Sequence, residues 1–244
     1  MLNRKQLPNF GILKNIKVEM PVLLDALRNN NLLDFEVYND IDVSKNGRYS
    51  NFTVTNSFNK RSFFTEDKSL AGEEYRQLYL TDPEDNIANA VVQEKESTTL
   101  SRTRRLDPSH KDYDPVADEL NYGKRNNYCI PEINALLDQF SQYDKVTRVR
   151  LALLRKHFSI KPHIDYDPSY IVRYHVPLIT NEQCKLSCRV KGEDYSAHFK
   201  PDGSVYFLNA GHLHWASNDS DYDRLHLIVD VHGQNLLQHI EEYK

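Results

Sequence analysis

The pattern of apolar and polar positions changes near residue 145. Beyond it, short β-branched and aromatic segments alternate with polar residues, which is typical of half-buried strands. Turn residues separate the segments, including Lys191-Gly192-Glu193 and Pro201-Asp202-Gly203. The predicted strands are Val146–Leu154, Ile171–Ile179, Cys184–Val190, Tyr195–Phe199, Val205–Leu208, His214–Ser217 and Leu225–Val231. About eight antiparallel strands in this length suit a double-stranded β-helix, which is a jelly roll.

The preceding residues contain two stretches with helical periodicity, each beginning at a proline. Proline suits the first helical position, so we predict helices starting at Pro21 and Pro131. The second runs to Phe140, with its apolar residues at Ile133, Leu136, Leu137 and Phe140. Other predicted elements are short strands at 50–56 and 74–80, a polar segment at 92–127 and a closing helix at Gln234–Tyr243.

These elements predict a mainly β fold with flanking helices and a double-stranded β-helix core. Residues 1–145 are expected to form an N-terminal arm with elements on the substrate side, and residues 146–244 the catalytic core. We expect the two parts to form one integrated domain. The polar segment at 92–127 is either a solvated loop or an ordered loop that faces the substrate.

Composition narrows the class of protein. A net charge of −4 and a pI near 6.2 argue against nucleic acid or an anionic membrane as the main partner. Three cysteines cannot all pair internally, and we expect reduced thiols that are buried or half-buried. Cys184 and Cys188 could share a zinc ion, but no second pair at finger-like spacing accompanies them. With no signal peptide or membrane segment evident, we predict a cytoplasmic protein.

Candidate chemistry begins at His163-Ile164-Asp165. Residues two apart in a strand point to the same face, so His163 and Asp165 can both face a barrel interior. A second histidine would complete the set of two histidines and one carboxylate that binds iron and leaves positions open. His214, 51 residues beyond His163, can supply it. His212 shares its strand parity, but the following residues favour His214.

Two arginines and a further histidine fit an anionic co-substrate. Arg224 follows His214 by ten residues and offers a planar fork to a carboxylate. Arg173 and His175 share one face of a predicted strand, where burial would require an anion or a hydrogen-bond partner. Two alternatives stay open. Arg224 could form a surface ion pair, and Arg173 and His175 could face solvent. The other histidines, His226 among them, are expected to be structural or exposed.

Taken together, these motifs resemble the aspartyl/asparaginyl β-hydroxylase-like family of oxygenases, which includes proline cis-hydroxylases. The resemblance covers about a third of the chain and lies in four elements in a fixed order. They are Pro162-His163-Ile164-Asp165, Arg173 through Leu178, the turn at Asp202-Gly203 leading to Val205–Leu208, and His214 through Asp230.

The resemblance implies Fe(II), 2-oxoglutarate and O2 as cofactor and co-substrates, and hydroxylation of an amino acid, free or within a peptide, with release of succinate and CO2. It implies that His163, Asp165 and His214 bind the metal, and that Arg224, with Arg173 and His175, holds 2-oxoglutarate. Asp165 matches the proline hydroxylase branch, because the aspartyl hydroxylase branch lacks this carboxylate.

Two other functions stay open. A cupin-like metalloenzyme would keep the metal ligands without needing Arg224, and a non-catalytic jelly-roll binding module would need neither. Arginines 102, 104, 105 and 150 are further candidates to bind a substrate carboxylate.

Overall fold

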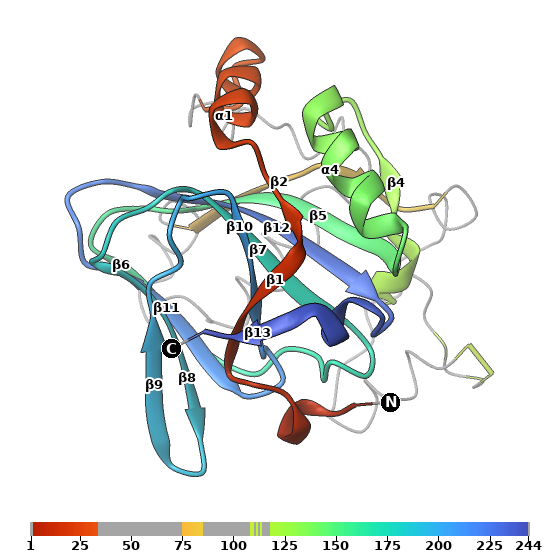
Figure 1. Ribbon diagram of the computed structural model, residues 1–244, viewed down its shortest axis with the longest axis vertical. Helices are drawn as coiled ribbons and strands as arrows, with labels where there is room; N and C mark the ends of the chain where they lie inside the picture. The colour runs from red at the N-terminus through yellow and green to blue at the C-terminus, as the bar shows by residue number, and fades with distance from the viewer. Residues whose placement is uncertain are drawn as a thin grey trace.

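A computed structural model of the chain describes residues 2–33, 75–84, 108–109, 111, 113 and 118–243. Two sheets and two α-helices make up most of the fold (Figure 1). The helices are α1 (Met20–Asn29) and α4 (Pro131–Ser141), with short 3-10 helices η1 (Arg4–Gln6), η4 (Glu119–Asn121) and η5 (Leu236–His239). The strands are β1 (Phe10–Lys17), β2 (Tyr75–Tyr79), β3 (Thr81–Asp82), β4 (Lys124–Arg125), β5 (Lys145–Leu154), β6 (Phe158–His163), β7 (Val172–Ile179), β8 (Cys184–Val190), β9 (Glu193–Ala197), β10 (Ser204–Leu208), β11 (Leu213–Asn218), β12 (Arg224–His232) and β13 (Ile240–Glu242).

The strands from β5 to β12 form the predicted double-stranded β-helix. One sheet has the order β13-β1-β10-β7-β12-β5-β2, and the facing sheet has the order β6-β11-β8-β9. All pairings within both sheets are antiparallel. The chain changes sheets at each step from β5 to β8, and again at each step from β9 to β12. This crossing between two sheets defines the jelly roll, so the predicted fold class is confirmed.

Each face of the seven-stranded sheet has its own core. Alternate residues of β5, β7 and β12, such as Leu151, Tyr174 and Leu227, pack against α1 and α4, which lie together in Figure 1. The opposite face looks into the barrel, where a second apolar cluster includes Phe199 and Tyr206. Because side chains alternate along a strand, the residues between the outward-facing ones point into the barrel. That inner face carries the polar groups described below.

Two glycine turns lie between strands at positions where the sequence predicts turns. Lys191 and Gly192 join β8 to β9 with φ values of 53° and 90°, as a two-residue hairpin turn of the primed type requires. Gly203, with φ of 84°, precedes β10, and a Cβ there would lie 2.3 Å from the carbonyl oxygen of Val18. No other residue type fits this close approach without a shift of the backbone.

The prediction of a helix at Gln234–Tyr243 is wrong. This segment contains only the short η5, and then Ile240–Glu242 pairs as β13 with the edge strand β1. Its apolar residues have helical spacing, but the open edge of β1 offers backbone hydrogen bonds that a short C-terminal helix lacks. Sequence reasoning also missed β1 itself.

The helices predicted at Pro21 and Pro131 and most predicted strands are present. Ile133, Leu136, Leu137 and Phe140 are all buried on α4, as its periodicity predicts. The strand predicted at 74–80 is β2, whereas the one at 50–56 lies outside the described residues, as does most of 92–127. β1 and β2 precede residue 146 and yet belong to the main sheet, so the sheet spans the two parts expected from the sequence.

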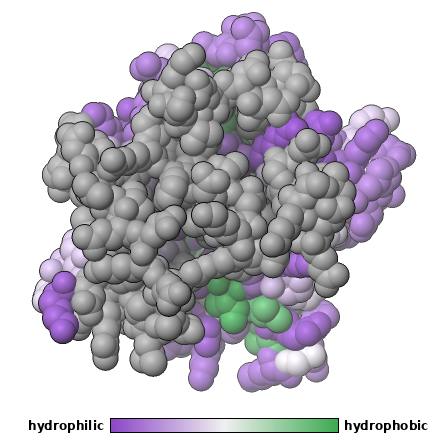
Figure 2. Space-filling model, turned by 180° about the vertical axis from the view of Figure 1, so that it is seen from behind, coloured by the Kyte–Doolittle hydropathy of each residue, from purple (hydrophilic) through white to green (hydrophobic). Residues whose placement is uncertain are grey.

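All three cysteines are buried and free of disulfides, as predicted. Hydrophilic residues make up most of the coloured surface in Figure 2, and a small hydrophobic group lies near its lower edge. Among the described helices, none has the length and apolar character that crossing a bilayer requires.

Candidate metal and co-substrate site

The three predicted metal ligands meet at one end of the barrel. His163 at the end of β6 lies directly opposite His214 at the start of β11, and their ring centroids are 4.3 Å apart. Asp165 places its carboxylate oxygens 3.7 Å from Nε2 of His163 and 3.8 Å from Nε2 of His214. Across the described residues, no other group of His, Cys, Asp or Glu has three ligand atoms this close together. His212 lies apart, with its Nε2 next to the backbone oxygen of Arg4.

Asp165 reaches the site by a different route from the one predicted. We predicted His163 and Asp165 on one strand face, but β6 ends at His163. The backbone N–H of Asp165 donates to the carbonyl of Ala210 at 3.0 Å, which fixes the segment after the strand. A loop pinned to the neighbouring connection therefore positions the carboxylate.

Backbone carbonyls orient both histidines for metal binding. Nδ1 of His163 lies 2.8 Å from the carbonyl of Lys161, and Nδ1 of His214 lies 3.0 Å from that of His212. A carbonyl only accepts, so Nδ1 carries the proton and Nε2 keeps its lone pair. Burial lowers the pKa of His214 to about 4, partly opposed by Asp165, so this imidazole is neutral at neutral pH. Two imidazole Nε2 atoms and one carboxylate match the facial ligand set of non-heme Fe(II).

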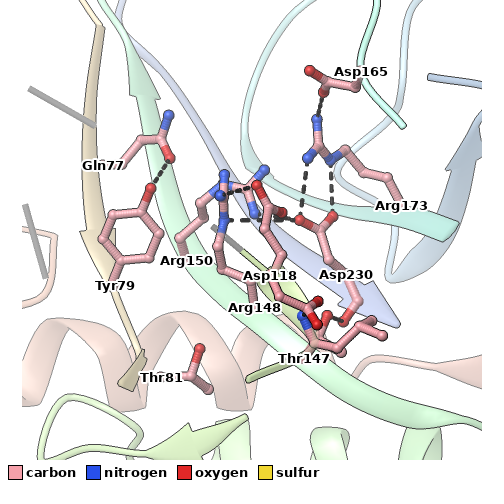
Figure 3. Close-up of polar contacts among 12 residues, drawn as sticks. Gln77, Tyr79, Thr81, Asp118, Thr147, Arg148, Arg150, Asp165, Arg173 and Asp230 are labelled. Carbon is pink, nitrogen blue, oxygen red and sulfur yellow. Dashed lines mark hydrogen bonds and ion pairs between the residues drawn. The ribbon is translucent and has the colours of Figure 1, made fainter. Parts of the chain in front are cut away.

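Arg173 connects the metal ligands to a buried row of charges (Figure 3). Its Nη1 pairs with the Asp165 carboxylate, and its Nε and Nη2 donate to Asp230 at 2.8 and 3.1 Å. Asp230 also accepts from Arg150 at 2.7 Å. Burial raises the pKa of Asp165, but Arg173, then His163 and His214, more than reverse this and leave the pKa far below its usual range. The carboxylate is therefore ionised, as a metal ligand must be.

The 3-10 helix η4 extends this row on the side of β2. Glu119 accepts from Nη1 of Arg148 at 2.6 Å, and both side chains are buried. The preceding residue, Asp118, accepts from Tyr170 at 2.6 Å and from Tyr113 at 2.9 Å. Part of the polar segment predicted at 92–127 is thus ordered against the barrel.

Arg224 lies buried in the barrel, and no ion pair joins it to the residues that the structure describes. Only 2% of the residue is exposed, and neither its Nε nor its Nη1 has a hydrogen-bond partner among the described residues. Nε2 of His175 and Nε2 of His226 are likewise buried without partners there. Burial lowers the pKa of Arg224, and Tyr75 raises it slightly. These four buried polar atoms lie in one region and lack partners among the described residues, which favours a polar ligand, and an anionic one beside the guanidinium.

The remaining predicted residues divide into three groups. Arg173 and His175 both face the barrel interior, but Arg173 is already bonded to Asp165 and Asp230, which leaves Arg224 as the candidate anchor for an anion. Arg150 is paired with Asp230, and arginines 102, 104 and 105 lie outside the described residues. Glu119, Asp230 and His226 were not identified from the sequence as site residues. The sequence did contain a signal for Asp230 and His226. Each lies an even number of residues from Arg224 on one strand, so the three side chains share a face.

Comparison with known proteins agrees with this geometry. A family model described as aspartyl/asparaginyl beta-hydroxylase matches residues 85–233, more than half of the chain. The chain belongs to this family. Every predicted ligand of this aspartyl/asparaginyl β-hydroxylase family member lies within the matched residues.

Several solved structures resemble parts of the chain. One is a 2OG-Fe(II) oxygenase family oxidoreductase from Burkholderia pseudomallei, at 12% identity over 66% of this chain and 69% of the other, with a TM-score of 0.36. A cupin domain from Bordetella pertussis matches at 16% identity over 36% and 83%, with a TM-score of 0.28. The non-heme alpha ketoglutarate dependent epimerase SnoN from nogalamycin biosynthesis matches at 14% identity over 42% and 53%, with a TM-score of 0.32.

Proposed function

We propose that this protein is an Fe(II)- and 2-oxoglutarate-dependent oxygenase that hydroxylates an amino acid, free or within a peptide. One observation carries the proposal: a facial set of two histidines and one carboxylate lies in the same barrel as a buried arginine whose Nε and Nη1 have no hydrogen-bond partner among the described residues. The ligand set alone fits many metalloenzymes. A buried guanidinium without an anion is costly, and a co-substrate carboxylate would remove that cost.

The residues have distinct roles in this proposal. His163, Asp165 and His214 would hold Fe(II), and Arg224 would pair with the distal carboxylate of 2-oxoglutarate. Arg173 orients the Asp165 carboxylate and keeps it ionised. Asp230 holds Arg173 in turn through two hydrogen bonds. Asp165 also favours the proline cis-hydroxylase branch of the family over the aspartyl hydroxylase branch.

The overall reaction would convert a C–H bond, O2 and 2-oxoglutarate into a C–OH group, succinate and CO2. Iron and the co-substrate supply the oxidising power when they are bound, whereas the protein supplies orientation and a site shielded from water. The aromatic rings of Phe199 and Tyr206, stacked with centroids 4.4 Å apart, form part of that shielded interior.

The test is turnover under ¹⁸O2. The protein would be incubated with Fe(II), 2-oxoglutarate and pools of free amino acids and short peptides, and the products analysed by mass spectrometry. We expect one substrate class to gain a single ¹⁸O atom, with an equal amount of succinate formed. An Asp165→Ala variant should produce neither. Oxygen incorporation that does not depend on 2-oxoglutarate would refute the proposal in favour of a cupin-like metalloenzyme.

A further inference from the structure

Two buried histidines contact each other beside Arg224. His175 on β7 and His226 on β12 are 3% and 2% exposed, and their Nδ1 atoms lie 3.4 Å apart. Their ring centroids are 5.6 Å apart and the ring planes cross at 78°. The register partner of His226 on β5 is Ala152, whose methyl group offers no hydrogen bond. Among the described residues, the only hydrogen-bond partner of each imidazole is therefore the other one.

Both imidazoles are neutral at neutral pH. Burial lowers the pKa of His175 well below its usual value, and Arg224, Arg173 and Arg150 lower it further against a smaller effect of Asp230. Burial likewise lowers the pKa of His226, followed by the effects of Arg224, His175 and His198. The groups that face the pair are thus mainly cationic or neutral, and a second proton on either ring is disfavoured.

Neutrality fixes the number of protons that the pair can present. A hydrogen bond between two Nδ1 atoms needs one that carries a proton and one that carries a lone pair. The ring that accepts at Nδ1 must carry its own proton on Nε2, and the ring that donates must have a bare Nε2. The pair therefore exposes one donor and one acceptor. Both Nε2 atoms are buried without partners among the described residues.

We propose that His226 is a positioning residue for the co-substrate: its Nδ1–H donates to Nδ1 of His175 and fixes the tautomer whose Nε2–H donates to a carboxylate oxygen of 2-oxoglutarate. This inference rests on the proposed function. A carboxylate oxygen only accepts, so the ring that faces it must present the donor. The bare Nε2 of His226 is favoured by the guanidinium of Arg224, two residues away on the same face of β12.

The first test needs no variant. In ¹⁵N-labelled protein loaded with Zn(II), a diamagnetic substitute for Fe(II), and with 2-oxoglutarate, long-range ¹H–¹⁵N spectra report the tautomer of each histidine. We expect the proton on Nε2 of His175 and on Nδ1 of His226. The opposite assignment with 2-oxoglutarate bound would overturn the inference. Failure of 2-oxoglutarate to bind the wild-type protein at all would instead count against the proposed function.

Three variants then separate the hydrogen bond from simple packing. His226→Asn can place an amide N–H near the position of Nδ1, His226→Gln reaches the position of Nε2, and His226→Leu offers neither. We expect the Leu and Gln variants to bind 2-oxoglutarate about tenfold more weakly, the loss typical of one hydrogen bond to a charged group. The Asn variant should keep most of the affinity, and Zn(II) affinity should be unchanged in all three. Wild-type affinity in His226→Leu would refute the positioning role.

Discussion

Replacing Arg224 with methionine should make the ligand-free protein more stable while it abolishes co-substrate binding. A structural arginine would behave in the opposite way, because its removal would leave a partner unpaired. Arg224 has no carboxylate partner among the described residues, and two of its nitrogens are buried without hydrogen bonds. Burial of this unpaired guanidinium therefore lowers the free energy of unfolding of the ligand-free protein, and a bound anion would remove that loss.

The magnitude follows from those two nitrogens. A buried donor without a partner costs about 1–3 kcal/mol, so the pair costs about 2–6 kcal/mol before any relaxation. Methionine keeps an apolar stem of similar length, so little packing is lost with the guanidinium. Relaxation and water entry reduce the gain, and we expect Arg224→Met to raise the free energy of unfolding by at least about 1 kcal/mol.

Urea unfolding of the metal-free proteins in the presence of a chelator measures this difference directly. The matched control is Arg150→Met, since Arg150 is equally buried but is paired with Asp230 at 2.7 Å. Breaking that pair should cost about 3–5 kcal/mol. With Zn(II) present, 2-oxoglutarate at about one hundred times its Kd should stabilise the wild type by about 2.7 kcal/mol and Arg224→Met not at all. A ligand-free Arg224→Met protein that is clearly less stable than wild type would refute the reasoning.

Three further predictions test the surroundings of the site. Asp230→Asn should lower the free energy of unfolding by about 3–5 kcal/mol, because two buried guanidinium groups lose their shared carboxylate; a loss below about 1 kcal/mol in urea unfolding would contradict this. His226 has a pKa lowered on folding, so below pH of about 6.5 the unfolded chain takes up a proton that the folded chain does not, and stability falls as the pH drops. Between pH 6 and 5, the free energy of unfolding of the wild type should therefore fall by up to about 1.4 kcal/mol per pH unit more than that of His226→Asn. Parallel curves of unfolding free energy against pH for the two proteins would contradict this. Gly203→Ala should cost about 1–3 kcal/mol because of its positive φ and the nearby carbonyl of Val18, with 2-oxoglutarate affinity unchanged.

Much of the fold was predictable because it depends on local patterns. Strand alternation and glycine turns located the barrel strands after residue 145 except β6, which was not among the predicted strands, and a 3.6-residue period located α4. The C-terminal segment failed because Leu236, Leu237 and Ile240 have helical spacing, whereas their structure depends on the distant edge of β1. Pairing partners of this kind are not encoded in a local period.

The candidate site was predictable to a similar extent and for a related reason. The motifs around His163, Asp165 and His214 are short, and their order along the chain carries the resemblance to the family. The charged row was missed because the partners of Glu119 and Asp230 are known only once η4 packs against β5 and β12 pairs beside β5 in the sheet. A buried acidic residue on an apolar strand looks like any other polar position until its partner is known.

The measurement that tests the central claim most directly is anaerobic titration of the metal-free protein with Fe(II) and 2-oxoglutarate, followed by visible absorption. A charge-transfer band should appear only when both are present. His163→Ala should abolish it, and Arg224→Met should shift its formation to far higher 2-oxoglutarate concentrations. Iron binding without any such band would contradict the assignment of 2-oxoglutarate to this site.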